Sequence, residues 1–190
     1  MPELPEVEIL KESLSKNIKL AKIRNIKINN INLRYKVPKS LNKILKGQII
    51  KNISRISKYL ILHFTFNKKL LIHLGMSGTI HLIRNKNDLN TNASFCHSLN
   101  LPKKHNHIEI SLNNGLQLIY NDPRRFGYLK LMNKNFMKES PLNKLGPDPF
   151  HSAFNFEYIE NYVKNKKRSI KNLLMDQTFV SGIGNIYANE

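Results

Sequence analysis

The first eight residues, Met-Pro-Glu-Leu-Pro-Glu-Val-Glu, combine groups that could do chemistry at the start of the chain. A small second residue permits removal of Met1, which would leave Pro2 with a free secondary amine. Such an amine attacks electrophilic carbons and forms an iminium adduct without a cofactor. Glu3 supplies an adjacent carboxyl group that can serve as a general acid. The simpler interpretation is a processed N-terminus with Pro5 in the first turn of an acidic helix.

Two further segments combine glycine with residues suited to nucleic acid. Residues 122–127, Asp-Pro-Arg-Arg-Phe-Gly, set two arginines beside Phe126, which suits phosphate binding and stacking, although a salt-bridged turn explains the same string. Residues 181–185, Ser-Gly-Ile-Gly-Asn, form a glycine turn before a helical pattern. Backbone N–H groups at such a turn bind phosphate, and Asn185 adds a side-chain donor. Ordinary helix punctuation is the alternative for this second segment.

Positive charge dominates the composition and is distributed unevenly. The chain has 31 Lys and Arg against 13 Asp and Glu, a formal net charge of +18. No acidic residue occurs between Glu12 and Asp88, where lysine and arginine recur. Because this much unpaired charge repels itself, a polyanionic partner is expected, either nucleic acid or an anionic membrane surface. The cations interleave with strand-like alternation, which favours nucleic acid over the membrane.

The sequence predicts neither a metal site nor a membrane anchor. The lone Cys96 excludes an internal disulfide and a four-cysteine zinc site within these residues. Cys96, His97, His105 and His107 are zinc ligands by type, but their spacing fits no closed motif, so no metal site is predicted. No run of residues is apolar enough to span a membrane and no signal peptide follows Met1, so we expect an intracellular protein.

The hydrophobic pattern predicts a helix followed by antiparallel strands. Residues 5–16 read as a helix with Val7, Leu10 and Leu14 on one face. Alternating residues on both sides of Asn114-Gly115 predict a hairpin. Together with other short strands, this pattern indicates a β-sandwich or barrel. The other expected strands lie near 26–33, 59–64, 70–73, 79–83 and 127–131, the polar tract Arg84–Lys104 reads as a loop, and helical periodicity returns near 156–163, 170–174 and 186–190.

Taken in order, several segments resemble the formamidopyrimidine-DNA glycosylase family. They are the opening string, Ser-Lys-Tyr-Leu at 57–60, His-Leu-Gly-Met-Ser-Gly at 73–78, the Asp-Pro-Arg-Arg-Phe-Gly string, and residues 174–188 with the glycine turn. The resemblance covers essentially the whole chain. It implies an α+β fold in which an N-terminal helix packs on an antiparallel β-sandwich (1–138), a linker (139–150), and the beginning of a helix-two-turn-helix domain (151–190), with DNA in the cleft between them.

The same resemblance implies a bifunctional DNA glycosylase and AP lyase that removes 8-oxoguanine and formamidopyrimidines and nicks DNA by β,δ-elimination. It makes Pro2 the nucleophile, Glu3 its acid and Lys58 a proton-transfer group, with Glu6 holding the N-terminal region. The DNA contacts would come from Met76 and Phe126 as wedges, Arg124 at the orphaned base, and His73, His105, Arg125, Lys166 and Asn185.

Two alternatives differ from this hypothesis in function. One is a non-catalytic DNA-binding remnant. The other is a pyrimidine-lesion glycosylase like endonuclease VIII, but that branch carries glycine where this chain has Leu4, so purine lesions are favoured.

The family also ends in a four-cysteine zinc finger, which implies Zn²⁺ for the family. These residues cannot supply that site, so a truncated chain or a fragment, with uncertain activity, is expected. The expected partner is damaged double-stranded DNA, bound by a monomer in the bacterial cytoplasm at the nucleoid, with no role for a membrane.

Overall fold

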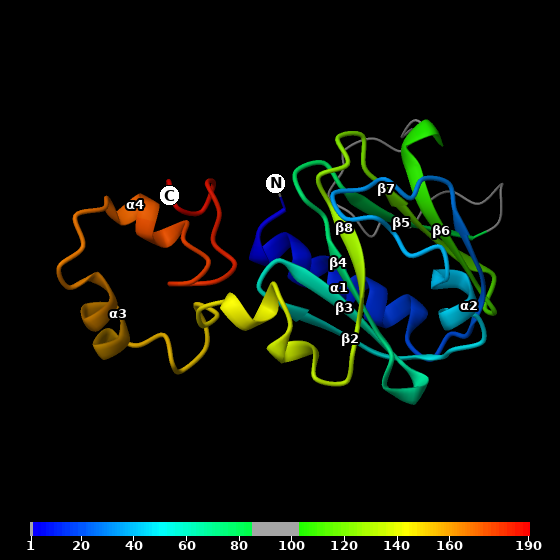
Figure 1. The fold of residues 1–190 in the computed structure, drawn as a ribbon, viewed down its shortest axis with the longest axis horizontal. Coiled ribbons are helices and arrows are strands. Elements are labelled where there is room, and N and C mark those ends of the chain that lie inside the picture. Colours follow the sequence, from blue (N-terminus) through cyan, green and yellow to red (C-terminus); the bar gives the residue numbers. More distant parts are fainter. Residues whose placement is uncertain (1, 85–102) are drawn as a thin grey trace.

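The computed structural model describes residues 2–84 and 103–190 (Figure 1). Most of the predicted loop Arg84–Lys104 lies outside the described residues, as do Met1, Cys96 and His97. Within the described parts, no helix combines the length and apolar character that crossing a membrane requires.

The N-terminal helix α1 (Leu4–Ile18) begins and ends slightly beyond the predicted 5–16. Its buried face contains the predicted Val7, Leu10 and Leu14, together with Leu4 and Ile18. The spacing of three or four residues places these side chains along one stripe, which faces the protein core. The helix therefore forms where its periodicity predicts, with Pro2 and Glu3 directly before it and Glu6 in its first turn.

Two four-stranded antiparallel sheets form the sandwich. One has the order β1-β6-β7-β5 and the other β2-β3-β4-β8. The Asn114-Gly115 hairpin joins β6 to β7, and Gly115 adopts a φ of +83° that suits glycine. The predicted α+β class is confirmed, although the first strand ends at Ile28 and does not reach Leu33. The strands are β1 (Ile23–Ile28), β2 (Ile50–Ile56), β3 (Tyr59–Phe64), β4 (Lys69–His73), β5 (Thr79–Arg84), β6 (Asn106–Leu112), β7 (Leu116–Asn121) and β8 (Tyr128–Met132).

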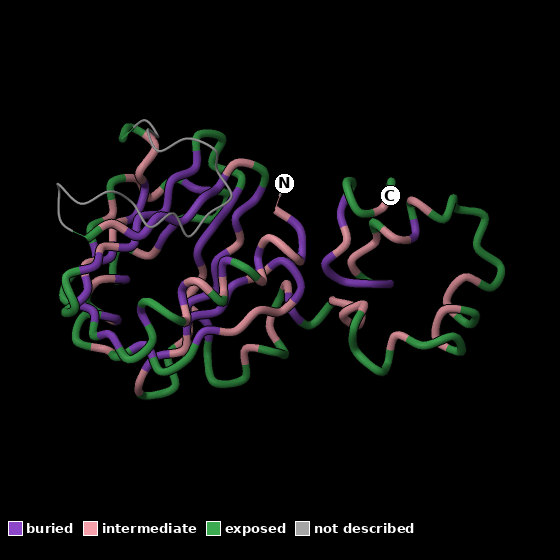
Figure 2. The backbone as a smooth tube through the Cα atoms, turned by 180° about the vertical axis from the view of Figure 1, so that it is seen from behind, coloured by how far each residue is buried: buried purple, intermediate pink, exposed green. Residues whose placement is uncertain are grey.

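The main core lies between α1 and the two sheets. Buried side chains from α1, from both sheets and from the short helix α2 (Leu41–Leu45) form one cluster. Figure 2 shows buried backbone concentrated in the sandwich, with exposed segments around it. Four short 3₁₀ turns lie outside the strands: η1 (Thr65–Asn67), η2 (Lys103–His105), η3 (Phe136–Lys138) and η4 (Leu142–Lys144), the last of them within the predicted linker.

A smaller helical part follows residues 139–150 and lies at the end of the molecule opposite α2 (Figure 1). It contains α3 (Phe156–Val163) and α4 (Ile170–Leu174) around a small core of Leu173, Phe179 and Val180. Asn155 and Ser169 cap the two helices by accepting backbone hydrogen bonds. The helix predicted from Ile186 is a series of turns. The glycine turn before this segment contacts the start of α1, where Leu4 N–H donates to the Gly182 carbonyl (3.1 Å).

Candidate active site

The Glu3 carboxylate lies against the glycine turn of the C-terminal segment. Its side chain is 2% exposed and accepts backbone hydrogen bonds from Gly184 (2.5 Å) and Ile186 (2.9 Å). A Cβ at Gly184 would lie 2.5 Å from the carboxyl carbon of Glu3, so the approach requires glycine. The amides that the sequence suggested for phosphate binding therefore hold the protein's own carboxylate beside Pro2, which is half-buried.

Lys58 reaches the same place from the β2–β3 hairpin. Its side chain is 5% exposed, and Nζ donates to the Ile183 carbonyl (2.8 Å). Burial lowers the pKa of Lys58, and the charges of Glu3 and Glu6 offset only part of that shift. A lysine with a lowered pKa exchanges protons more readily near neutral pH than a solvated lysine does.

Glu6 ties the N-terminus to both parts of the protein. Its Oε2 accepts the Glu3 backbone N–H (2.8 Å), and the Tyr187 hydroxyl donates to Oε1 (3.3 Å). The structure therefore gathers Pro2, Glu3, Glu6 and Lys58 around the turn at 183–187. A proline that would carry a free secondary amine once Met1 is removed, two carboxyl groups and a lysine amine beside one turn are groups that could support covalent attack followed by proton transfer.

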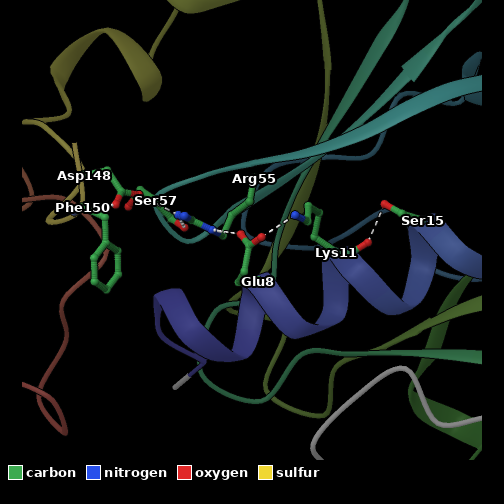
Figure 3. A network of polar contacts seen from close by, with 7 residues as sticks. All are labelled: Glu8, Lys11, Ser15, Arg55, Ser57, Asp148 and Phe150. Atoms are coloured by element: carbon green, nitrogen blue, oxygen red, sulfur yellow. Dashed lines mark hydrogen bonds and ion pairs between the residues drawn. The ribbon is translucent and has the colours of Figure 1, made fainter. Parts of the chain in front are cut away.

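Arg55 joins α1, the β2–β3 hairpin and the linker in one polar network (Figure 3). Its guanidinium donates to Glu8 (2.5 Å), to the Ser57 carbonyl (2.9 Å) and to Asp148 (3.0 Å). Burial raises the pKa of Glu8, but hydrogen bonds from Lys11 and Arg55 outweigh it and leave that pKa below its usual value. No local sequence pattern indicates this network, because Glu8 and Asp148 are far apart in the chain.

Replacing Arg55 with alanine is expected to lower the free energy of unfolding by about 1–3 kcal/mol, because two carboxylates lose a partly buried partner. Urea denaturation measures the change. The matched control is Arg24→Ala, an exposed arginine on β1, which should change stability by less than about 0.5 kcal/mol. Equal effects of the two substitutions would show that the network does not stabilise the fold.

Two loops, one after β4 and one before β8, present the predicted wedge residues. Met76 lies exposed in the turn after β4, and Phe126 lies exposed in the turn before β8. The guanidinium of Arg124 lies 4.6 Å from the centroid of the Phe126 ring, a cation–π contact. Arg125 is exposed in the same turn, with a φ of +58°. An apolar tip and a cation–aromatic pair on two loops suit contact with unstacked bases.

Asp122 fixes these two loops relative to each other. The buried carboxylate accepts hydrogen bonds from Ser77 Oγ (2.5 Å), Tyr120 Oη (3.1 Å) and Gly127 N (2.9 Å). Among the described residues it forms no ion pair with either neighbouring arginine, so the alternative of a salt-bridged turn is not what the structure has. Gly75 adopts a φ of +65°, and a Cβ there would lie 2.5 Å from Gly127 N.

His73 and His105, the expected DNA contacts, and His107, a zinc ligand by type, have different surroundings. His73 is stacked on Tyr128, and its Nδ1 accepts the Gly75 N–H (3.2 Å), so the neutral ring carries its proton on Nε2. His105 is half-buried, and its carbonyl accepts the Asp122 N–H (3.1 Å). His107 is buried and donates from Nε2 to the Asp122 carbonyl (2.7 Å), as a structural histidine does.

Acid is expected to destabilise the protein through His73. Burial, with Arg34 and Lys58 nearby, lowers the pKa of His73 to about 4. Between pH 6.5 and about 4 the unfolded chain therefore takes up a proton that the folded chain does not, and stability falls by up to about 3 kcal/mol as the pH falls. Urea denaturation at each pH should show this slope, and His73→Gln should remove most of it.

The exposed His151 provides the control, since His151→Gln should leave the slope intact. His63, whose pKa burial also lowers, keeps its own contribution in both variants. A His73→Gln protein with the full acid slope would contradict the assignment.

The remaining predicted DNA contacts lie on the helical part. Lys166 is exposed, with Nζ 4.0 Å from the centroid of the Tyr162 ring, and Asn185 is exposed on the turn that binds Glu3. Gln177, to which the sequence pattern assigned no role of its own, holds that turn in place: it donates to the Ile183 carbonyl (2.7 Å) and accepts from Gly182 N (2.9 Å).

No group of three or more His, Cys, Asp or Glu suited to a metal occurs among the described residues. One cysteine in 190 residues does not fit a four-cysteine zinc site.

Comparisons with known proteins match both parts of the chain. The model of the formamidopyrimidine-DNA glycosylase N-terminal domain matches residues 1–129, and that of the H2TH domain of the same glycosylase matches residues 145–190. Curated proteins named formamidopyrimidine-DNA glycosylase are 40% identical in Legionella pneumophila strain Lens and 38% identical in Rickettsia felis. This chain aligns over its full length with the first of these and spans 64% of the length of each.

Solved structures agree with these matches. The complex between Lactococcus lactis Fpg and an abasic-site-containing DNA is 32% identical, with a TM-score of 0.84, and the match covers 99% of this chain and 66% of that one. A complex of inhibited Lactococcus lactis Fpg with DNA containing N7-benzyl-Fapy-dG has a TM-score of 0.85 at 32% identity, covering 100% of this chain and 66% of that one.

Proposed function

Because the chain belongs to the formamidopyrimidine-DNA glycosylase family, we propose that it excises oxidised purines from duplex DNA and then nicks the strand. The observation that carries the proposal is the grouping of Pro2, buried Glu3 and buried Lys58 around the turn at 183–187. The protein would act as a monomer on damaged DNA in the bacterial cytoplasm.

In the first step the Pro2 nitrogen attacks C1′ of an extruded nucleotide. The new N–C1′ bond replaces the glycosidic bond, and the base leaves with a proton. Glu3 protonates the sugar ring oxygen, so that the ring opens and an iminium forms between Pro2 and C1′. The charged iminium then makes the C2′ proton acidic.

Strand cleavage follows from that iminium. In β-elimination the C2′ proton passes to water, the bond between C3′ and its oxygen breaks, and the 3′ phosphate leaves. The protonated Lys58 amine is the proton donor in this step. A second elimination releases the 5′ phosphate and leaves a one-nucleoside gap. Hydrolysis of the remaining adduct frees Pro2. Met76 and Phe126 would fill the vacated stack, and Arg124 would pair with the orphaned base.

The DNA would lie across the side of the sandwich that carries Pro2 and Lys58 and would reach the helical part. His73 is suited to donate from Nε2 to a phosphate, because its Nδ1 already accepts the Gly75 N–H. His105, Arg125, Lys166 and Asn185 would add phosphate contacts that position the duplex.

Borohydride reduction tests the proposal, because it converts the iminium into a stable protein–DNA adduct. The purified chain is incubated with duplexes that carry 8-oxoguanine, thymine glycol or no lesion, and adducts are counted on denaturing gels. We expect more adduct with 8-oxoguanine than with thymine glycol, and none with undamaged DNA.

The other outcomes identify the alternatives. A preference for thymine glycol would favour the pyrimidine-lesion branch. DNA binding without any adduct would favour a non-catalytic remnant, above all if the chain fused to a family zinc finger does form the adduct.

A further inference from the structure

A second cationic surface lies at the far end of α1 from the candidate active site. Three segments lie side by side there: residues 19–22, 46–51 and 65–68. Leu20 N–H donates to the Ile50 carbonyl (2.8 Å), and Thr65 N–H donates to the Ile49 carbonyl (3.1 Å), so residues 48–51 run between the other two segments. We call these three segments the basic ledge.

The basic ledge is separate from the candidate active site. Glu3 precedes α1 and Leu20 follows it, and a 15-residue helix is about 22 Å long. Figure 1 shows α2, the helix before the second segment, at the end of the molecule opposite α3 and α4. The ledge therefore lies about 22 Å from Pro2 and shares no residue with the DNA contacts of the proposed function.

The cations of the ledge are solvated and unpaired. Each is exposed, and none forms an ion pair with any described residue. They belong to the stretch from Glu12 to Asp88 in which the sequence has no acidic residue. Closely spaced positive charges without partners favour a polyanionic ligand. The cations are Lys19, Lys22, Lys46, Lys51 and Lys68.

The ledge also exposes two large apolar side chains on strained backbone. Leu20 is 70% exposed at a φ of +68°, and Phe66 is 82% exposed at a φ of +53°. Bulky residues rarely adopt this left-handed conformation, which costs of order 1–2 kcal/mol each. Folding alone would favour glycine or asparagine at both positions. Because both side chains are exposed, core packing does not explain why they are apolar.

We infer that the basic ledge binds a single-stranded nucleic-acid segment, with bases stacked on Phe66 and phosphates on the lysines. An aromatic face surrounded by cations is the common design of single-strand sites. A paired duplex offers no free base face to Phe66. A membrane surface is less suited, because the apolar groups come from isolated turns and not from an amphipathic helix. The inference adds a second ligand to the proposed function and does not depend on catalysis.

Fluorescence anisotropy with labelled eight-nucleotide strands tests the inference on the full chain. An unlabelled lesion duplex is added first to occupy the candidate active site. Even if no duplex binds there, the difference in strand affinity between the wild type and the ledge variants reports on the ledge alone. The strands are oligo-dT, oligo-rU and a base-free deoxyribose-phosphate strand. The tighter of the first two indicates whether the natural ligand is DNA or RNA.

Phe66→Asn removes the stacking face and introduces a residue that tolerates the left-handed conformation. It should weaken binding of oligo-dT roughly 10-fold and leave the base-free strand unchanged. The triple variant K19Q/K22Q/K51Q should weaken both strands and reduce the slope of log affinity against log salt by about 2. The control K134Q/K138Q/K144Q removes the same charge from exposed lysines outside the ledge and should change neither.

Unchanged oligo-dT affinity in both ledge variants would overturn the inference. The inference would also be overturned if the ledge variants lost binding to anionic phosphatidylglycerol vesicles but still bound the strands, because that result would assign the ledge to membranes. The borohydride adduct depends on Pro2 and should form in all the variants, so failure of the ledge and failure of the proposed function are distinguishable.

Discussion

A chain that keeps residues ahead of Pro2 will form no borohydride adduct, and removing them will restore it. An upstream residue converts the Pro2 nitrogen into a tertiary amide, which has no lone pair for attack at C1′. The chain is made with a protease-cleavable extension and assayed on abasic DNA before and after cleavage to Pro2. The expected difference is at least about 10³-fold, the scale seen when a covalent nucleophile is lost.

The control is the ability to bind DNA, since the extension must block chemistry and not access. The extended and cleaved chains should bind a non-reactive abasic duplex within a few-fold of each other. If the extended chain formed as much adduct as the cleaved chain, the nucleophile would have to be another amine, such as a lysine, and the proposed mechanism would be contradicted.

Lys58→Gln should stop strand nicking without abolishing the covalent adduct. The amide cannot transfer a proton at the iminium stage, so nicking of abasic DNA should slow by about 10²–10⁴-fold. Burial lowers the pKa of Lys58 from the usual lysine value of 10.5. As the pH rises, the nicking rate of the wild type should therefore begin to decline before pH 10.5 is reached, because the protonated amine is lost. Rates at a series of pH values, with adduct yield measured in parallel, separate the two steps.

Lys58→Arg supplies the discriminating variant, because its guanidinium stays charged throughout this range. It should nick more slowly than wild type but without the alkaline decline. A Lys58→Gln chain that nicks at the wild-type rate would exclude Lys58 from proton transfer.

Local sequence patterns predicted the parts of this protein whose structure depends on neighbours in the chain. The face of α1 follows from the spacing of Val7, Leu10 and Leu14, and the β6–β7 hairpin follows from Asn114-Gly115 between alternating strands. The short strings around Pro2 and Lys58 also named residues that the structure brings together at one site.

The contacts that build the site could not be predicted, because they join residues far apart in sequence. Glu3 accepts hydrogen bonds from Gly184 and Ile186 across the whole chain, and a glycine turn alone does not say which anion it binds. Asp122 was considered as an ion-pair partner of arginine, but its oxygens accept from Ser77, Tyr120 and Gly127. Chain topology, and not residue type, decides these pairings.

Identifying the residue that carries the reduced adduct tests the central claim most directly. The chain is trapped on abasic DNA with borohydride and digested with nuclease and protease, and the modified peptide is sequenced by tandem mass spectrometry. We predict that the added sugar mass lies on the nitrogen of Pro2, in a peptide that has lost Met1. The same mass on Lys58 or on any other lysine would contradict the account.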